Sequence, residues 1–187
     1  MKRAVFVFGV VCLFATLALG EPPQFSVGYV YQGSQPVPGS DWFGLSGARA
    51  DVTWPVTPRW STVGEFSGVH AESYGSSGSP LTLLTFMAGP RFSWPVRSRE
   101  AGRVVPFAQV LLGGAHATVG VFPQGQSLKT TATSFAMSAG GGLQIGLRPG
   151  VSLRLIQVDY LYLRMPNLYD QWQKSFRIGA GVVFQLR

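Results

Sequence analysis

Large apolar residues alternate with small or polar residues over long stretches in the last third of the chain, residues 134–187. In the first of these stretches the apolar residues fall on odd positions, at Phe135, Met137, Ala139, Leu143, Ile145 and Leu147. The positions between them carry Ala136, Ser138, Gly140, Gly142, Gln144 and Gly146. A period of two is typical of a β-strand with one apolar face and one small, polar face. Because a tilted strand of about 9–11 residues can cross a bilayer, the pattern predicts membrane-spanning strands.

The same alternation divides the chain into eight predicted strands separated by turn-forming residues. The strands are expected over residues 25–32, 42–54, 60–74, 81–94, 104–118, 134–147, 151–164 and 176–187. Every second connection is a loop containing Gly, Ser or Pro, namely residues 33–40, 75–80, 119–133 and 165–175. The other connections are mostly shorter and begin at or near a proline. Alternating short turns and longer loops predict an up-and-down outer-membrane barrel with both termini in the periplasm.

The amino terminus has the features of a secretory signal peptide. Lys2 and Arg3 precede an apolar run over residues 4–19, and small residues at Ala18 and Gly20 fit cleavage before Glu21. A transmembrane helix is the alternative, but the run is short for one. We therefore expect a signal peptide over residues 1–20 and a barrel domain over residues 21–187. The only cysteine lies within the apolar run, so the mature chain is expected to form no disulfide and no cysteine-based metal site.

Composition agrees with a sheet that has one face in lipid. Hydrophobic residues make up 46% of the chain and charged residues only 12%, about half of the globular average. A soluble, secreted barrel of the lipocalin type is the alternative, with its apolar face inside and its charges exposed. The chain has a net charge of +7, but its basic residues are scattered, so we expect no nucleic-acid partner. We expect contacts with outer-membrane lipid and with the phosphates of lipopolysaccharide instead.

Several charged residues fall on the strand face opposite the apolar side chains. A charge on the lipid face costs about 2–4 kcal/mol at the bilayer midplane, so these residues are predicted to point into the barrel. They are Arg49, Asp51, Glu65, Arg91, Asp159 and Arg177. An eight-stranded barrel is just wide enough for its own side chains, and buried charges need partners. The sequence therefore predicts a lumen filled by paired charges, with a narrow ion path as the alternative.

The residues offer little for catalysis or metal binding. His70 is followed by Glu72 and Ser73 at the predicted outer rim, which are the residue types of a lipid hydrolase. Successive strand residues point to opposite faces, so Ser73 would lie away from His70. His116 is interpreted as an interfacial residue. We predict no catalytic residues, and two separated histidines without cysteine predict no metal and no cofactor.

Four segments resemble the small outer-membrane β-barrel proteins of the OmpA-like transmembrane type. They are residues 106–114 (PFAQVLLGG), 135–143 (FAMSAGGGL), 156–161 (IQVDYL) and 177–184 (RIGAGVVF). The resemblance implies an all-β, eight-stranded antiparallel barrel in the cell outer membrane, but no substrate, because such proteins have diverse roles. The last strand also resembles the signal read by the barrel-assembly machinery, with Gly181, Phe184 and Leu186 at suitable offsets, although it ends in Arg187.

The sequence thus predicts a non-enzymatic, monomeric barrel with a structural or surface-interaction role. Two alternatives remain open at this point. One is a small pore or passive channel, which requires a hydrated lumen. The other is a rim enzyme acting on outer-membrane lipid, which requires catalytic side chains converging near His70.

Overall fold

The computed structural model describes residues 22–35, 43–74, 79–94, 96–98, 102–121, 128–164 and 173–186. The predicted signal peptide over residues 1–20, parts of the four predicted long loops, and Arg187 lie outside the described residues. No helix in the described residues is long and apolar enough to cross a membrane.

Nine strands follow one another along the described chain. They are β1 (Gln24–Gln35), β2 (Phe43–Pro55), β3 (Trp60–Tyr74), β4 (Ser79–Ser93), β5 (Val96–Ser98), β6 (Gly102–Val121), β7 (Leu128–Arg148), β8 (Val151–Arg164) and β9 (Gln173–Gln185).

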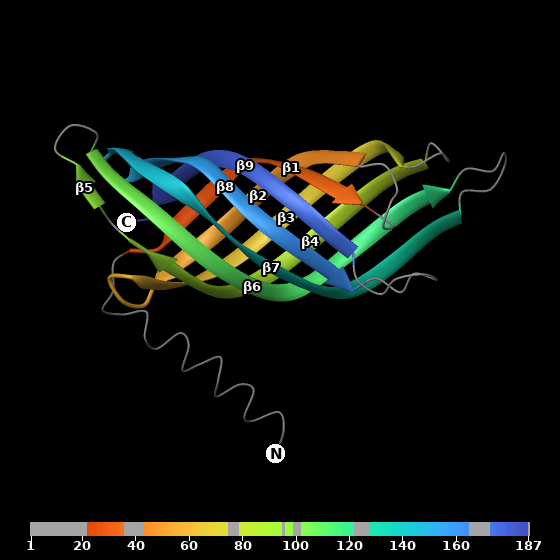
Figure 1. Ribbon diagram of the computed structural model, residues 1–187, viewed down its shortest axis with the longest axis horizontal. Helices are drawn as coiled ribbons and strands as arrows, with labels where there is room; N and C mark the ends of the chain where they lie inside the picture. Colours follow the sequence, from red (N-terminus) through yellow and green to blue (C-terminus); the bar gives the residue numbers. More distant parts are fainter. Residues whose placement is uncertain are drawn as a thin grey trace, which may run out of the picture.

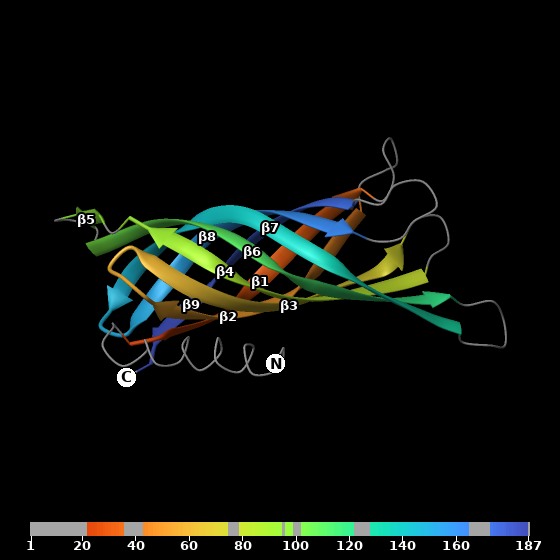
Figure 2. The ribbon, with the colours of Figure 1, turned by 90° about the horizontal axis from the view of Figure 1, so that it is seen from below.

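All of these strands except β5 close into one antiparallel barrel (Figures 1 and 2). Most neighbours in the barrel are neighbours in sequence, β1 pairs with β9, and β4 pairs directly with β6. Closure removes the unpaired strand edges that an open sheet would present. The predicted all-β, eight-stranded up-and-down barrel is confirmed.

The two ends of the barrel differ, and we call them the turn end and the loop end. The turn end carries the β2–β3, β4–β6 and β7–β8 connections, and it also holds both ends of the described chain. There the amide of Leu186 donates to the carbonyl oxygen of Pro23 at 2.8 Å. The β7–β8 turn needs glycine at Gly150, whose φ of 83° is disfavoured for other residues.

Some residues predicted as connections lie in strands. In the connection between the predicted strands 81–94 and 104–118, Val96–Ser98 form β5, which pairs only with the start of β6. The predicted loop 119–133 is shorter than expected, because β6 and β7 continue to pair as far as Val121 and Leu128. The threonine-rich start of β7 favours a strand, and a hairpin can keep pairing beyond the closed barrel. The β6–β7 hairpin consequently extends furthest at the loop end (Figure 1).

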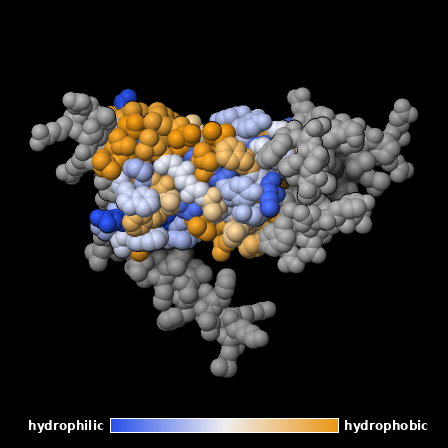
Figure 3. Space-filling model, in the orientation of Figure 1, coloured by the Kyte–Doolittle hydropathy of each residue, from blue (hydrophilic) through white to orange (hydrophobic). Residues whose placement is uncertain are grey.

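Large apolar side chains cover the outer face of the barrel. Those that are exposed include Val27, Tyr29, Phe66, Phe86, Val110 and Leu112. On the face seen in Figure 3, hydrophobic residues (orange) gather toward the turn end of the barrel. The predicted charged residues are buried in the interior. This arrangement is the reverse of a soluble barrel and is the one that a lipid environment requires.

Aromatic side chains mark the boundary of the apolar surface at the turn end. Phe92 packs edge-on between Trp60 and Trp94, with ring centroids 4.8 and 4.5 Å apart. Both tryptophans are about half exposed. Tryptophan is enriched where a membrane meets water, so this cluster is typical of a membrane interface.

Candidate functional site in the barrel lumen

Strand alternation directs charged side chains from five strands into the lumen. The six predicted residues come from β2, β3, β4, β8 and β9, and each is at most 5% exposed. Arg154 of β8 joins them. We call these seven side chains the charged layer: Arg49, Asp51, Glu65, Arg91, Arg154, Asp159 and Arg177.

Four members of the charged layer form a balanced cluster of two arginines and two carboxylates. Arg49 Nη1 lies 2.7 Å from Asp159 Oδ2 and 3.5 Å from Glu65 Oε2. Arg177 Nη2 lies 3.0 Å from Glu65 Oε1 and 3.8 Å from Asp159 Oδ2. Each arginine therefore contacts both carboxylates, and the cluster joins β2, β3, β8 and β9. Burial of these charges is tolerable because each has an opposite charge nearby.

The other three members, nearer the turn end, share a single carboxylate. Arg154 Nη1 and Nη2 reach the two oxygens of Asp51 at 2.6 and 3.2 Å, which is a two-pronged contact. Arg91 Nη2 lies further from Asp51 Oδ1, at 3.6 Å. Its nearer partners are neutral, since it donates to Gln109 Oε1 at 2.7 and 3.0 Å and to Thr53 Oγ1 at 3.0 Å.

Neutral polar side chains bind several of the remaining donors and acceptors of the charged layer. Gln157 Nε2 donates to both oxygens of Asp159, at 3.2 and 3.0 Å. Arg177 also donates to the hydroxyls of Ser67 and Ser138, each at 3.2 Å. A hydrogen-bonded network of this kind fixes the side chains in one arrangement.

Arg154 was not expected in the lumen, because strict alternation with Gln157 and Asp159 places it on the outer face. The pairing of β8 with β9 shifts between Arg154 and Gln157, so a β-bulge interrupts the alternation. Leu155 and Ile156 are both exposed as a result, and Arg154 turns inward. Two adjacent apolar residues after an arginine are the only sequence signal for the bulge. That signal is weak.

Apolar side chains fill the lumen beyond the charged layer. A buried cluster includes Leu45, Leu83, Met87, Leu111, Ala117, Leu161 and Leu163. Several members lie near the loop ends of their strands; Leu163, for example, is one residue from the end of β8. Because the small residues Gly and Ala on the same strands leave little bulk, these leucines can pack across the barrel. We call the buried residues named above the apolar cluster.

The two histidines lie on the outside of the barrel. Nδ1 of His70 is 2.9 Å from Oγ1 of Thr82, and Nδ1 of His116 is 3.0 Å from Oγ1 of Thr133. Each histidine is therefore exposed and contacts a threonine on the adjacent strand. The side chains of Glu72 and Ser73 lie outside the described residues. Among the described residues no group of three His, Cys, Asp or Glu side chains could hold a metal ion.

The residues of the predicted assembly signal occupy β9 and the position after it. Phe184 and Leu186 point outward and are exposed. Gly181 lies where β9 passes β1, and a Cβ there would meet the carbonyl oxygen of Val27. These positions are compatible with recognition from the lipid side, and the signal itself stays a prediction.

Comparison with solved structures relates this architecture to known barrels. Neisserial surface protein A superposes with a TM-score of 0.70 at 15% identity, covering 88% of this chain and 97% of that one. Ail, the attachment invasion locus protein of Yersinia pestis, superposes with a TM-score of 0.54 at 23% identity, covering 88% of this chain and 100% of that one. The chain has the fold of the small outer-membrane β-barrels. Neither a protein-family model nor a curated protein matches the sequence.

This fold, the apolar outer face and the interfacial tryptophans agree with residence in the outer membrane. We expect the protein to fractionate with outer membranes and to show heat-modifiable mobility on a gel, because closed barrels resist detergent until heated. Boiling should shift the folded band of the purified protein. Recovery as a soluble periplasmic protein would contradict this expectation and favour a barrel that binds an apolar ligand.

Proposed function

We propose that this protein is a non-enzymatic outer-membrane barrel with a structural or surface-interaction role and a lumen closed to ions. The turn end faces the periplasm, and the loop end faces the exterior. Outer-membrane lipid and lipopolysaccharide surround it, the barrel-assembly machinery inserts it, and it acts as a monomer. The β6–β7 hairpin, which extends furthest at the loop end, is the first candidate for contacts with a surface partner.

The observation that carries this proposal is that two groups of side chains fill the lumen, the charged layer and the apolar cluster. Four arginines and three carboxylates are buried and linked by ion pairs of 2.6–3.8 Å. Beyond them, the apolar cluster contains leucines with almost no exposed surface. A permeating ion would have to displace the paired charges and then pass an apolar region without its hydration shell. The pore alternative would need a continuous hydrated path.

Conductance measurements test the closed lumen. In planar bilayers the purified wild-type barrel is expected to show no steady conductance. The double variant Glu65→Ser, Arg177→Ser removes one opposite-charged pair and keeps the net charge of the charged layer. We expect it to increase the frequency of conducting events, because it opens space for water where the ion pair lies.

A matched control is offered by the next residues along the same strands, Phe66 and Ile178, which point outward. The double variant Phe66→Ala, Ile178→Ala should conduct no more than the wild type. Steady stepwise conductance by the wild-type barrel would overturn the proposal and favour the passive channel.

A further inference from the structure

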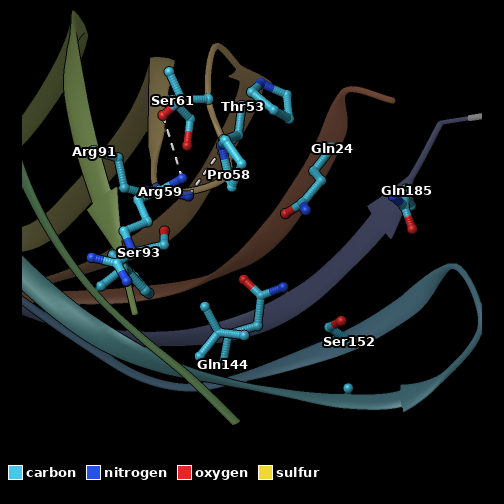
Figure 4. Close-up of a pocket in the computed structure, with 15 residues that line it drawn as sticks. Gln24, Thr53, Pro58, Arg59, Ser61, Arg91, Ser93, Gln144, Ser152 and Gln185 are labelled. Carbon is cyan, nitrogen blue, oxygen red and sulfur yellow. Dashed lines mark hydrogen bonds between the residues drawn. The ribbon is translucent and has the colours of Figure 1, made fainter. Parts of the chain in front are cut away.

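A polar cavity opens into the barrel at the turn end. Its volume is 230 Å³, and about 10–15 Å³ suffices for one water molecule, so it can hold a small solute with several waters. Figure 4 shows its two sides, with Arg59, Arg91 and Ser93 facing Gln24, Gln144 and Gln185. We call this cavity the vestibule.

Arg91 at the inner end of the vestibule lacks a carboxylate of its own. In the charged layer, Arg49 and Arg177 are balanced by Glu65 and Asp159, whereas Arg91 and Arg154 share Asp51. Arg154 takes both oxygens of Asp51, which leaves Arg91 at 3.6 Å.

Near the vestibule, Arg91 and Arg154 therefore carry two positive charges, whereas Asp51 supplies one negative charge. Arg91 is only 3% exposed, and a buried cation with an incomplete counter-charge attracts an anion. Nε of Arg154 is also buried and has no hydrogen-bond partner among the described residues. The excess positive charge thus lies where the vestibule ends.

The remaining lining of the vestibule is suited to an anion. Its described lining residues include two arginines and no carboxylate. Hydroxyl and amide donors complete the wall, among them Ser61, Ser93, Ser152, Gln24, Gln144 and Gln185. Phe107 forms part of the lining, and the Arg91 guanidinium stacks 4.5 Å from its ring centroid, which holds the arginine in place.

We propose that the vestibule binds a small oxyanion, a phosphate or a carboxylate, between Arg91 and Arg59. The fork of donors on the exposed Arg59 guanidinium matches the oxygens of either group. Arg91, whose nearest donors already bind Gln109 and Thr53, contributes its positive charge, and serine, threonine and glutamine side chains can bind the oxygens that remain. The oxyanion completes the charge balance of Arg91. This function goes beyond the structural role proposed above, and it does not depend on whether the lumen conducts.

Titration of the purified, folded barrel with inorganic phosphate tests the site, in a maltoside detergent that carries no phosphate. Isothermal titration calorimetry is expected to show saturable binding of one phosphate per barrel in the millimolar range or tighter. Acetate is titrated in parallel. Preferential binding of either anion supports the site and identifies its chemistry.

Three variants locate the site. Arg59→Gln changes an exposed turn residue and should weaken phosphate binding about three- to tenfold. Ser93→Asp places a carboxylate in the vestibule and should abolish phosphate binding, because Arg91 then has a permanent counter-charge. Arg148→Gln is the matched control, since Arg148 is an exposed arginine at the same end that does not line the vestibule.

Two outcomes would overturn the proposal. One is the absence of saturable binding of both phosphate and acetate to the wild-type barrel. The other is an equal loss of binding in Arg59→Gln and Arg148→Gln, which would indicate attraction to surface charge alone. A barrel that conducts ions but binds phosphate in the vestibule would contradict the closed lumen and leave the anion site intact.

Discussion

Replacing Asp51 with asparagine is expected to lower the free energy of unfolding by about 3–5 kcal/mol, the cost of leaving buried charges without a partner. Asp51 is 2% exposed and, among the described residues, is the only carboxylate in contact with Arg154. It is also the only carboxylate within 4 Å of Arg91 in the described structure. Asparagine has nearly the same shape, so the substitution removes the charge without opening a cavity.

The measurement is reversible unfolding in urea from lipid vesicles, followed by tryptophan fluorescence. The double variant Asp51→Asn, Arg154→Gln separates charge from packing, because it removes the cation that lost its partner. We expect the double variant to be more stable than Asp51→Asn alone, and a double-mutant cycle gives the interaction energy of the pair. If Asp51→Asn unfolded at the same urea concentration as the wild type, the ion pairs of Asp51 would make no net contribution.

Placing arginine at Leu112 is expected to destabilise the barrel in the membrane by about 2–4 kcal/mol, whereas arginine at Leu147 should cost about 0–1 kcal/mol. Both leucines point outward and are exposed, with 51% and 61% of their surface accessible. Leu112 lies in the middle of β6 and pairs with Ala88, which is near the middle of β4. Leu147 lies beside the β7–β8 turn, so an arginine there can reach water or lipid headgroups.

The two leucine variants are compared by their folding equilibrium in phospholipid vesicles over a range of urea concentrations. Because the same substitution is made at both sites, the difference between them reports depth in the bilayer. Equal costs at the two positions would show that the outer face is not embedded in the way that the apolar surface indicates. A negligible cost at Leu112 would mean that this face lies in water.

The sequence predicted the architecture well because period-two alternation records the environment of each strand face directly. Alternation and the cost of a charge in lipid predict that Phe66 points outward and Glu65 inward. Alternation likewise places Val110 outward and Gln109 inward. Turn residues such as Pro149 and Gly150 mark the connections. Strand ends at the loop end were less predictable, because hairpin pairing of β6 and β7 continues where the membrane no longer selects the side chains.

The candidate site was predictable as a set of residues but not as a network. Alternation places Arg49 and Asp159 in the lumen, yet 110 positions separate them in the chain. Only closure of the barrel brings β2 opposite β8 and allows their 2.7 Å ion pair. The sequence shows equal numbers of predicted inward positive and negative charges. The excess positive charge beside the vestibule becomes visible only when Arg154 is added.

The fold class, the strand faces and the inward direction of six charges can be read from the chain, because these depend on local alternation and on the difference between lipid and water. The pairing of the charges, the inward turn of Arg154 and the packing of the apolar cluster follow only from the folded barrel. Those depend on strand register, on a bulge in β8 and on contacts across the barrel. Local sequence patterns do not encode the contacts across the barrel, because these join residues far apart in the chain and form only when the barrel closes.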